Sequence, residues 1–239
     1  MVLQQTRIIL YGYMMNRDTE FTLFDMSTWE RREIFHYFYH IAPTGYSLTA
    51  ELDITKLLDT LKTAGIKFYP AYIWLVTRNL KMYKEFKTAL VNGQPGYYNS
   101  LTPLYAVFHD DDKTFSLMWT EYSEDFNEFY EAYLKDKKNY GDNHGILAKK
   151  DCLPPENSYT VSSVPWVKFN SFAVHSYENK PYFFPSVEAG EYHTKDGKTM
   201  LPLSLTCHHA ATDGYHISLF LKGLQKDADS FGQYLKQKN

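Results

Sequence analysis

Cysteine is scarce in this chain, with two residues, Cys152 and Cys207, among 239. Two cysteines cannot build the disulfide framework of a small secreted domain, and no CxxC pair suggests a zinc site. Free thiols in a reducing compartment are the simplest interpretation. We therefore expect a cytoplasmic protein.

Long apolar runs and an excess of basic residues are also missing. The apolar stretch at residues 8–15 is too short to span a bilayer, and no small-residue cleavage site follows it. Lysine and arginine number 25 against 28 acidic residues, which gives a net charge of −3. A general nucleic-acid binder normally has a basic excess. We therefore expect neither a membrane nor a nucleic acid as a partner.

Aromatic residues are abundant instead, with 21 tyrosines and 16 phenylalanines. Together with a hydrophobic share of 44%, they supply a large core and exclude a disordered chain. The length fits one large domain or at most two small ones, and no convincing linker divides it. We interpret residues 1–20 as an N-terminal extension and residues 21–239 as a single domain.

Strand and helix patterns alternate along the chain and predict an α/β fold, a mixed β-sheet packed by helices. Asp196-Gly197 predicts a tight turn between two of the strands. Strands are expected at 47–54, 104–109, 114–122, 159–164, 166–175, 181–192 and 199–207, and helices at 27–42, 55–64, 70–86, 123–138 and from 214 onward.

The helix expected at 27–42 carries a charge on its apolar face. Ser27 and Glu30 have the spacing of a capping box. An arginine on a buried stripe needs a carboxylate partner, because an unpaired buried charge is very costly. The helix therefore predicts an acid elsewhere in the chain. The residues of this face are Arg31, Phe35, Phe38 and Ala42.

The segment most informative for chemistry is TCHHAATDGYH, residues 206–216. A strand brings His208 and His209 to its end, and Asp213-Gly214 then turns the chain into the last helix. The strand before and the Asp-Gly after favour a turn rather than one helix face. No third ligand has the spacing that zinc needs, so we expect no metal.

This segment resembles the H-H-x-x-x-D-G signature of the chloramphenicol acetyltransferases. The signature alone is shared with other CoA-dependent acyltransferases, but further blocks stand in this family's order and cover nearly everything from about residue 21 to the last helix. The resemblance implies the CoA-dependent acyltransferase fold for residues 21–239. The blocks are WERREIF (29–35), GYSLT (45–49), LDIT (52–55), KFYPA (67–71), VFHDDDKTFS (107–116), SVPWVKFNSF (163–172) and LPLSL (201–205).

The resemblance implies an antibiotic-resistance enzyme that moves acetyl from acetyl-CoA to a hydroxyl of chloramphenicol, directly in a ternary complex. His209 would be the general base, a role that suits imidazole because its unperturbed pKa lies near the operating pH. Ser162 matches the serine whose hydroxyl stabilises the tetrahedral oxyanion. Asp213 would form an ion pair with Arg31, which agrees with the need of that arginine for an acid, and the pair would fix the corner that carries His209.

The resemblance also implies the surroundings of these four residues. Tyr192 and Trp166 lie where CoA contacts are expected. Family members are trimers with the active site between subunits, so a homotrimer is implied. The residues that match the acceptor site are Tyr37, Phe38, Ala42, Tyr46, Phe115, Phe172 and Val174.

Four positions depart from the family pattern. Phe38 replaces a tyrosine whose hydroxyl can bond the acceptor, and Glu188 replaces a threonine that helps hold the oxyanion through water. A carboxylate there would oppose the developing negative charge unless it is protonated, paired or turned away. Thr44 replaces a common cysteine and Ala106 a common threonine. These changes bear on the acceptor and the rate more than on the reaction class.

Three alternatives stay open at this point. One is the same chemistry on a different hydroxylated acceptor, prompted by Phe38 and Glu188. Another is the catalytic core of a dihydrolipoyl acyltransferase, disfavoured because we see no lipoyl domain or Pro/Ala-rich linker ahead of the core. The last is a non-catalytic binding module on a degenerate fold, and the retained catalytic set counts against it.

Overall fold

A seven-stranded mixed sheet forms the centre of this computed structural model, which describes residues 20–150, 152–175 and 182–235. Its strand order is β2-β10-β8-β7-β5-β6, with β9 paired to β10, and the β5–β7 and β7–β8 pairs are parallel. The predicted α/β class with a mixed sheet is therefore confirmed. The strands are β2 (Gly45–Asp53), β5 (Thr102–Phe108), β6 (Phe115–Trp119), β7 (Ser158–Val164), β8 (Ser186–Gly190), β9 (His193–Lys195) and β10 (Lys198–His208).

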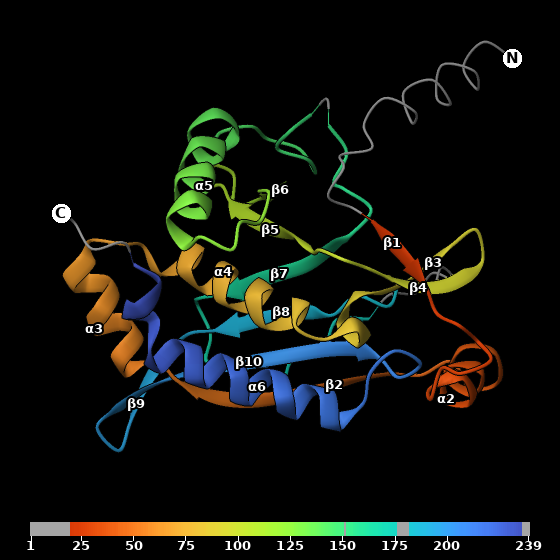
Figure 1. Cartoon of the computed structure of the whole chain (residues 1–239). Coiled ribbons are helices and arrows are strands. Elements are labelled where there is room, and N and C mark those ends of the chain that lie inside the picture. Colours follow the sequence, from red (N-terminus) through yellow and green to blue (C-terminus); the bar gives the residue numbers. More distant parts are fainter. Residues whose placement is uncertain (1–19, 151, 176–181, 236–239) are drawn as a thin grey trace, which may run out of the picture.

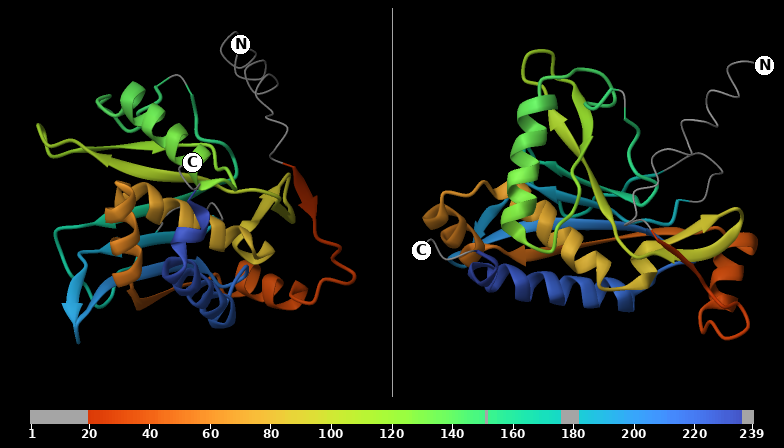
Figure 2. Two further views of the ribbon diagram at one scale, coloured as in Figure 1. Left: turned by 60° about the vertical axis from the view of Figure 1, so that its left-hand side comes forward. Right: turned by 45° about the horizontal axis from the view of Figure 1, so that its top comes forward.

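Helices cover one face of this sheet. Figure 1 shows α4 and α6 in front of the central strands, and the views in Figure 2 agree. Because α4 lies between the sheet, α5 and α6, residues 70–77 are buried on every side. Such a helix is apolar all round rather than amphipathic. The helices are α3 (Thr55–Ala64), α4 (Phe68–Lys81), α5 (Phe126–Tyr140) and α6 (Gly214–Asp229).

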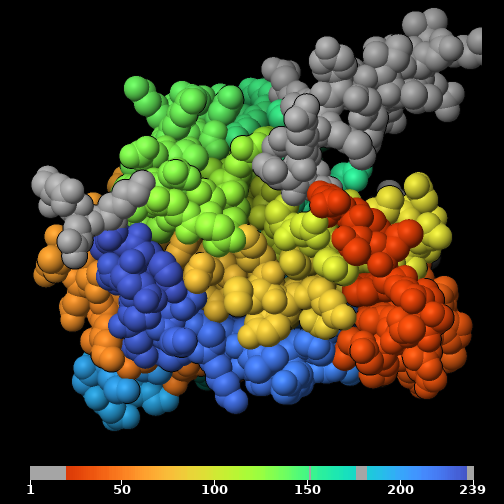
Figure 3. All heavy atoms as spheres, viewed as in Figure 1, coloured from red at the N-terminus to blue at the C-terminus, as the bar shows by residue number. Residues whose placement is uncertain are grey.

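A smaller sheet of order β1-β4-β3 lies beside the main one and consists of β1 (Phe21–Leu23), β3 (Thr88–Val91) and β4 (Gln94–Tyr98). After β1 come the short helix α2 (Arg32–His36) and the π-helical turn η1 (Tyr37–Ile41). Figure 3 shows these first described residues, in red, at one end of the molecule. A second core fastens this end to the turn after β10. Its buried residues are Phe24, Trp29, Phe35, Phe183, Ala210 and Ala211.

The helix predicted at 27–42 is wrong in its extent and in its cap. Asp25 accepts hydrogen bonds from the Ser27 backbone N–H at 2.9 Å and from its hydroxyl at 2.6 Å. A short acidic side chain that bonds to neighbouring residues competes with helix formation. The α-helix therefore begins only at Arg32, with Arg31 at the N-cap and no side-chain cap, and it passes into a π-turn at Tyr37.

Two of the predicted strands also need correction. Residues 166–175 form no strand but cross the face of the sheet opposite α4, where the Ser204 hydroxyl donates to the Phe172 carbonyl at 2.7 Å. The strand predicted at 181–192 shrinks to β8, and residue 181 lies outside the described residues. The helix predicted to reach Phe86 ends at Lys81 and is followed by a 3-10 turn, Lys84–Lys87.

Turn chemistry at Asp196-Gly197 is confirmed, since both residues have positive φ, 50° and 76°. This pair of values is typical of the two-residue hairpin turn that Asp-Gly favours, and here it joins β9 to β10. The extension expected at residues 1–20 falls almost wholly outside the described residues. No helix of the described chain is long and apolar enough to cross a membrane.

Candidate active site

The corner between β10 and α6 is held by Asp213. Its side chain caps α6 by accepting from the Tyr215 backbone N–H at 3.0 Å, and His216 completes a capping box. The other carboxylate oxygen accepts from the Arg31 guanidinium at 2.6 Å. Burial alone would raise the pKa of Asp213, but the hydrogen bond from Arg31 and the positive charge nearby hold this pKa below its usual value. One carboxylate therefore ties the N-cap of α2 to the corner.

The imidazole of His209 has one fixed orientation. Its Nδ1 lies 3.1 Å from the Thr212 carbonyl oxygen, and its backbone N–H donates to the Thr44 carbonyl at 2.8 Å. A carbonyl can only accept, so Nδ1 carries the hydrogen and the Nε2 lone pair stays free to take a proton. The ring stacks on Phe38 at 4.1 Å between centroids and also contacts Tyr46 at 5.0 Å.

The neighbouring His208 has the opposite tautomer. Its Nδ1 accepts from the Ala210 backbone N–H at 3.1 Å, which leaves the hydrogen of the neutral ring on Nε2. Burial, and then the neighbouring His209, lower the pKa of His208 and favour this neutral form. At Nδ1, His209 is therefore a hydrogen-bond donor, whereas its neighbour His208 is an acceptor.

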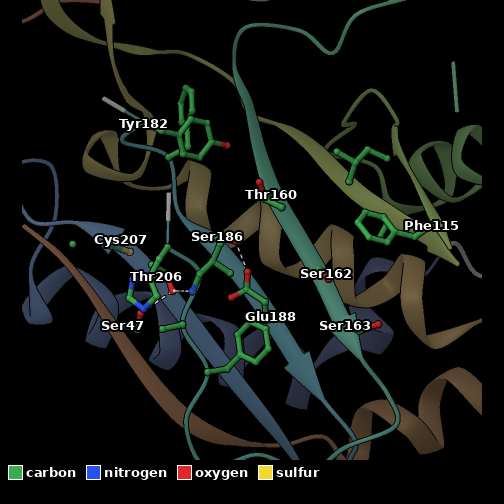
Figure 4. Close-up of a pocket in the computed structure, with 18 of the residues that line it drawn as sticks. Ser47, Phe115, Thr160, Ser162, Ser163, Tyr182, Ser186, Glu188, Thr206 and Cys207 are labelled. Carbon is green, nitrogen blue, oxygen red and sulfur yellow. Dashed lines mark hydrogen bonds between the residues drawn. The ribbon is translucent and has the colours of Figure 1, made fainter. Parts of the chain in front are cut away.

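A cavity of about 1390 Å³ opens on the sheet face opposite the α4 and α6 helices. Cross-strand partners on this face carry small hydroxyl side chains, whereas the alternate positions of the same strands, such as Val161 and Val187, belong to the core. Figure 4 shows polar side chains on β2, β10, β8 and β7, which are neighbours in the sheet. The hydroxyl residues that line the cavity include Ser47, Thr160, Ser162, Ser163, Ser186 and Thr206.

Ser162 and Glu188 are cross-strand partners within this cavity. The Ser162 hydroxyl has no hydrogen-bond partner among the described residues, while the buried Tyr72 hydroxyl donates to its backbone carbonyl at 3.3 Å. Glu188 is only 3% exposed and accepts a hydrogen bond from the Ser186 hydroxyl. Burial raises the pKa of Glu188 to about 7. An unpaired hydroxyl and a poorly solvated acid thus lie side by side.

One chain brings only part of the predicted site together. Ser162 lines the cavity, as do Trp166 and four of the predicted acceptor-site residues, whereas His209 is not among the lining residues. Tyr192 lies elsewhere, beside Phe68 at 6.3 Å between ring centroids. The four acceptor-site residues in the cavity are Tyr46, Phe115, Phe172 and Val174.

The other predicted acceptor-site residues surround the general-base candidate rather than the cavity. Tyr37 packs edge-on against Phe38, which covers one face of the His209 ring. Ala42 ends the π-turn, and its backbone carbonyl accepts from the Thr44 hydroxyl at 2.7 Å. Tyr46 lines the cavity and also contacts the His209 ring, so it connects the surroundings of His209 with those of Ser162.

Sequence reasoning missed the groups that orient His209. The backbone carbonyl of Thr212 sets the tautomer of the ring, and the backbone carbonyl of Thr44 holds the His209 backbone in position. No residue type marks a backbone carbonyl for such a role, so the sequence held no direct signal. Tyr72, which supports the Ser162 strand from α4, was likewise not singled out.

Three side chains near the β5–β6 turn have the chemistry of cation ligands. His109, Asp111 and His144 have ligand atoms within 4.8 Å of one another. Both nitrogens of His144 already lie close to carboxylates, Asp112 at 2.8 Å and Asp111 at 3.3 Å. The two imidazoles are stacked at 4.2 Å with 20° between their planes, so their in-plane lone pairs do not converge on a tetrahedral ion. The contacts of His144 with Asp111 and Asp112 therefore join the loop that contains His144 to the β5–β6 turn.

The chain matches known proteins over most of its length. The family model for chloramphenicol acetyltransferase matches residues 19–225. A chloramphenicol acetyltransferase of Clostridium perfringens is 40% identical over 92% of this chain and all of its own, and one of Staphylococcus aureus is 38% identical over 90% and 99%.

Solved structures show the same fold. A chloramphenicol acetyltransferase superposes with a TM-score of 0.79 at 23% identity, covering 91% of this chain and all of that one. The dihydrolipoamide acetyltransferase of Azotobacter vinelandii, at 20% identity, gives 0.59 over 85% and 88% of the two chains. With the matched signature held at the β10–α6 corner, the family match over most of its length shows that this chain belongs to the chloramphenicol acetyltransferase family.

Proposed function

We propose that the protein is an acetyl-CoA-dependent O-acetyltransferase that acetylates a hydroxyl of chloramphenicol. The observation that carries this proposal is the His209 imidazole, which is held by Thr212 with Nε2 free, within the family signature. Relatives at 37–40% identity over about nine tenths of the chain are named chloramphenicol acetyltransferase. Two substrates, acetyl-CoA and the alcohol, are the expected ligands, and no metal is part of the proposed reaction.

The reaction follows from what each group can donate or accept. His209 Nε2 takes the proton of the acceptor hydroxyl while that oxygen attacks the thioester carbonyl of acetyl-CoA. The carbonyl oxygen becomes an oxyanion, to which the Ser162 hydroxyl donates a hydrogen bond. When the intermediate collapses, the carbon–sulfur bond breaks and the proton on His209 passes to the sulfur of CoA. The acetyl ester and free CoA are the products.

Arg31 and Asp213 are positioning residues in this scheme. Their 2.6 Å contact joins the N-cap of α2 to the corner that carries His209. The arginine side chain is 12% exposed and that of Asp213 is 30% exposed, so water screens the pair only in part. The pair thereby sets the direction of the base without touching either substrate.

The complete active site is proposed to form between copies of this chain, in a homotrimer. His209 does not line the cavity that contains Ser162, which supports a site completed by a neighbouring copy. Large apolar side chains that line this cavity are also exposed, Phe115 at 53% and Trp166 at 64%. Burial of such side chains between chains would be favourable. Trp166 and the half-exposed Tyr192 are the proposed CoA contacts.

A second candidate keeps the chemistry and changes the acceptor. Phe38 lies directly on the His209 ring and offers no hydroxyl to an acceptor, and Glu188 adds an acid to the cavity. Both observations favour a hydroxylated compound other than chloramphenicol.

The two cysteines are free thiols, Cys207 buried and Cys152 partly exposed, which supports the proposed cytoplasmic location.

The test is release of CoA thiol from acetyl-CoA, with chloramphenicol and a panel of other alcohols as acceptors. We expect release with chloramphenicol and a loss of about 10²- to 10⁴-fold in kcat in His209→Ala. His36→Ala, at an exposed position on α2, is the matched control and should keep its activity. Release with another alcohol alone would establish the second candidate. Full activity in His209→Ala would refute the assigned base.

A further inference from the structure

Glu188 is a buried carboxyl inside the proposed active-site cavity. Its strand, β8, lies between β7 and β10, and Glu188 pairs with Ser162 across the parallel β7–β8 ladder. Cross-strand partners project their side chains from the same face of a sheet, and Figure 4 shows both residues on neighbouring strands. An oxygen bound by the Ser162 hydroxyl is therefore also within reach of the Glu188 carboxyl.

One of the two carboxyl oxygens has no partner. The Ser186 hydroxyl donates to Oε1, whereas Oε2 is buried without a hydrogen bond in the described part of the chain. A buried negative charge without a donor is very costly, so this environment favours the neutral acid. Burial raises the pKa of Glu188 to about 7, and the hydrogen bond from Ser186 offsets only part of this increase. The proton on Oε2 then has no acceptor among the described residues.

The titratable groups packed around Glu188 supply no compensating charge. Tyr72 on α4 and Cys207 on β10 are buried, and burial raises the pKa of each, so both are neutral near pH 7. Burial lowers the pKa of His208, which lines the same cavity and is therefore also neutral.

Besides tyrosines, three more charged or titratable side chains line the cavity from other elements. They are Lys137 on α5, Asp110 in the β5–β6 turn and His175 in the 165–175 segment. All three are exposed, and none forms an ion pair with Glu188 within the described ranges. Among the residues that the structure describes, the acid thus has only a neutral hydroxyl, that of Ser186, as its partner.

We propose that Glu188 acts as a neutral acid whose Oε2 donates a hydrogen bond to the oxyanion of the transition state, beside the Ser162 hydroxyl; this inference rests on the proposed function. Glu188 keeps its proton throughout. The acceptor's proton moves to His209 and then to the CoA sulfur, so the step needs no further proton source. Glu188 is therefore a catalytic residue of the cavity, since its proton contacts the reacting oxygen.

The protonation state of Glu188 then controls the rate. An ionised carboxylate beside the oxyanion would repel it, so turnover should decline as the pH rises through about 7. Glutamine has nearly the same shape, stays neutral and still donates from its amide. Alanine removes the donor altogether. These two substitutions separate the charge from the hydrogen bond.

The kinetic test measures kcat against pH for the wild type, Glu188→Gln and Glu188→Ala, with Glu131→Gln at an exposed position on α5 as the control. We expect the wild type and the control to lose turnover above about pH 7. Glu188→Gln should stay within a few-fold of the wild type at pH 6 and lack this decline, whereas Glu188→Ala should lose about 10²-fold in kcat. Equal losses in the Gln and Ala variants, or the same alkaline decline in wild type and Gln, would overturn the donor role.

A second measurement does not depend on activity. Infrared difference spectra of wild type minus Glu188→Gln should show the C=O band of a protonated carboxyl at pH 6 that is lost by pH 9. Absence of this band at pH 6 would overturn the inference even if acetyl transfer is rapid. Absence of thiol release from the wild type with every alcohol would instead contradict the proposed function, and the donor role would fall with it even where the band is present.

Discussion

The imidazole of His209 lies face to face with the phenyl ring of Phe38, with 4.1 Å between centroids and 11° between planes. The hydrogen bond from Nδ1 to the Thr212 carbonyl fixes the direction of the ring edge, and the stack fixes its plane. Together they leave one rotamer in which Nε2 can meet a substrate hydroxyl. In the proposed reaction, Phe38 would therefore act through the base that it covers.

Loss of this stack should slow the reaction rather than weaken acceptor binding. Phe38→Ala should lower kcat about 10- to 100-fold, because the base is no longer held in its attack geometry. Phe38→Tyr keeps the ring and adds a hydroxyl, so it should retain kcat and lower KM for chloramphenicol. Steady-state kinetics of both variants check this, and a Phe38→Ala enzyme with wild-type kcat would contradict the positioning role.

Ser162 and Ser163 offer a matched pair of substitutions on one strand. Both line the cavity, but Ser162 is the cross-strand partner of Glu188, whereas Ser163 is paired with Ala189. Ser162→Ala should lose about 10²-fold in kcat with little change in KM, since its hydrogen bond strengthens only as the oxyanion forms. Ser163→Ala should lose much less. The reverse ranking would show that the serine had been misassigned.

The proposed division of the site between copies predicts complementation. Homogeneous His209→Ala and Ser162→Ala proteins should both be nearly inactive. Mixed oligomers, made by co-expression or by refolding the two together, should recover part of the activity, because some interfaces then combine an intact base with an intact serine. Thiol release by the purified mixed species measures this. No recovery in verified hybrids would show that each chain supplies both groups to one site.

The Arg31–Asp213 ion pair predicts a specific dependence of stability on pH. The folded pKa of Asp213 lies below its ordinary value of 3.8. Its contribution is therefore fully present above about pH 4 and is lost as the pH falls through the folded pKa. Asp213→Asn should lower Tm at pH 7, and this difference should shrink towards pH 3.

Thermal melts of the wild type and Asp213→Asn across this range provide the check. The conservative variant Asp213→Glu serves as the second comparison, since it keeps the charge but lengthens the side chain. A constant difference in Tm from pH 7 to pH 3 would mean that the variant acts through the helix cap and not through the charge. Turnover should fall together with Tm, because the same pair orients the corner.

Local patterns predicted the elements whose ends are marked by turn chemistry. The α3 helix ends at Gly65 with a φ of 70°, and α6 begins after the Asp213 cap, close to the predicted positions. The prediction of a helix at 27–42 was wrong at its start because the Asp25 carboxylate bonds to Ser27 and holds a local turn ahead of the helix. Helical periodicity does not reveal such a turn. The alternation of residues 166–175 reflects a segment lying across a sheet face rather than within it.

The candidate site was predictable where it depends on side-chain charge and not where it depends on backbone atoms. A charge on an apolar stripe correctly predicted that Arg31 needs an acid, although the arginine lies at the helix N-cap and not along its face. The role of Thr212 could not be predicted, since any residue at that position supplies the same carbonyl. The protonation state of Glu188 depends on its burial, which only the packed structure defines.

The wide turn at Tyr37–Ile41 has a genetic consequence. Its closing hydrogen bond runs from the Ala42 N–H back five residues to the Tyr37 carbonyl, at 2.8 Å. Loss of a single codon within this stretch would restore ordinary α-helical spacing and swing the flanking side chains by about 100°. The Phe38 ring would then no longer stack on the His209 imidazole. Such an in-frame deletion would inactivate the protein although all of its reacting groups are still encoded.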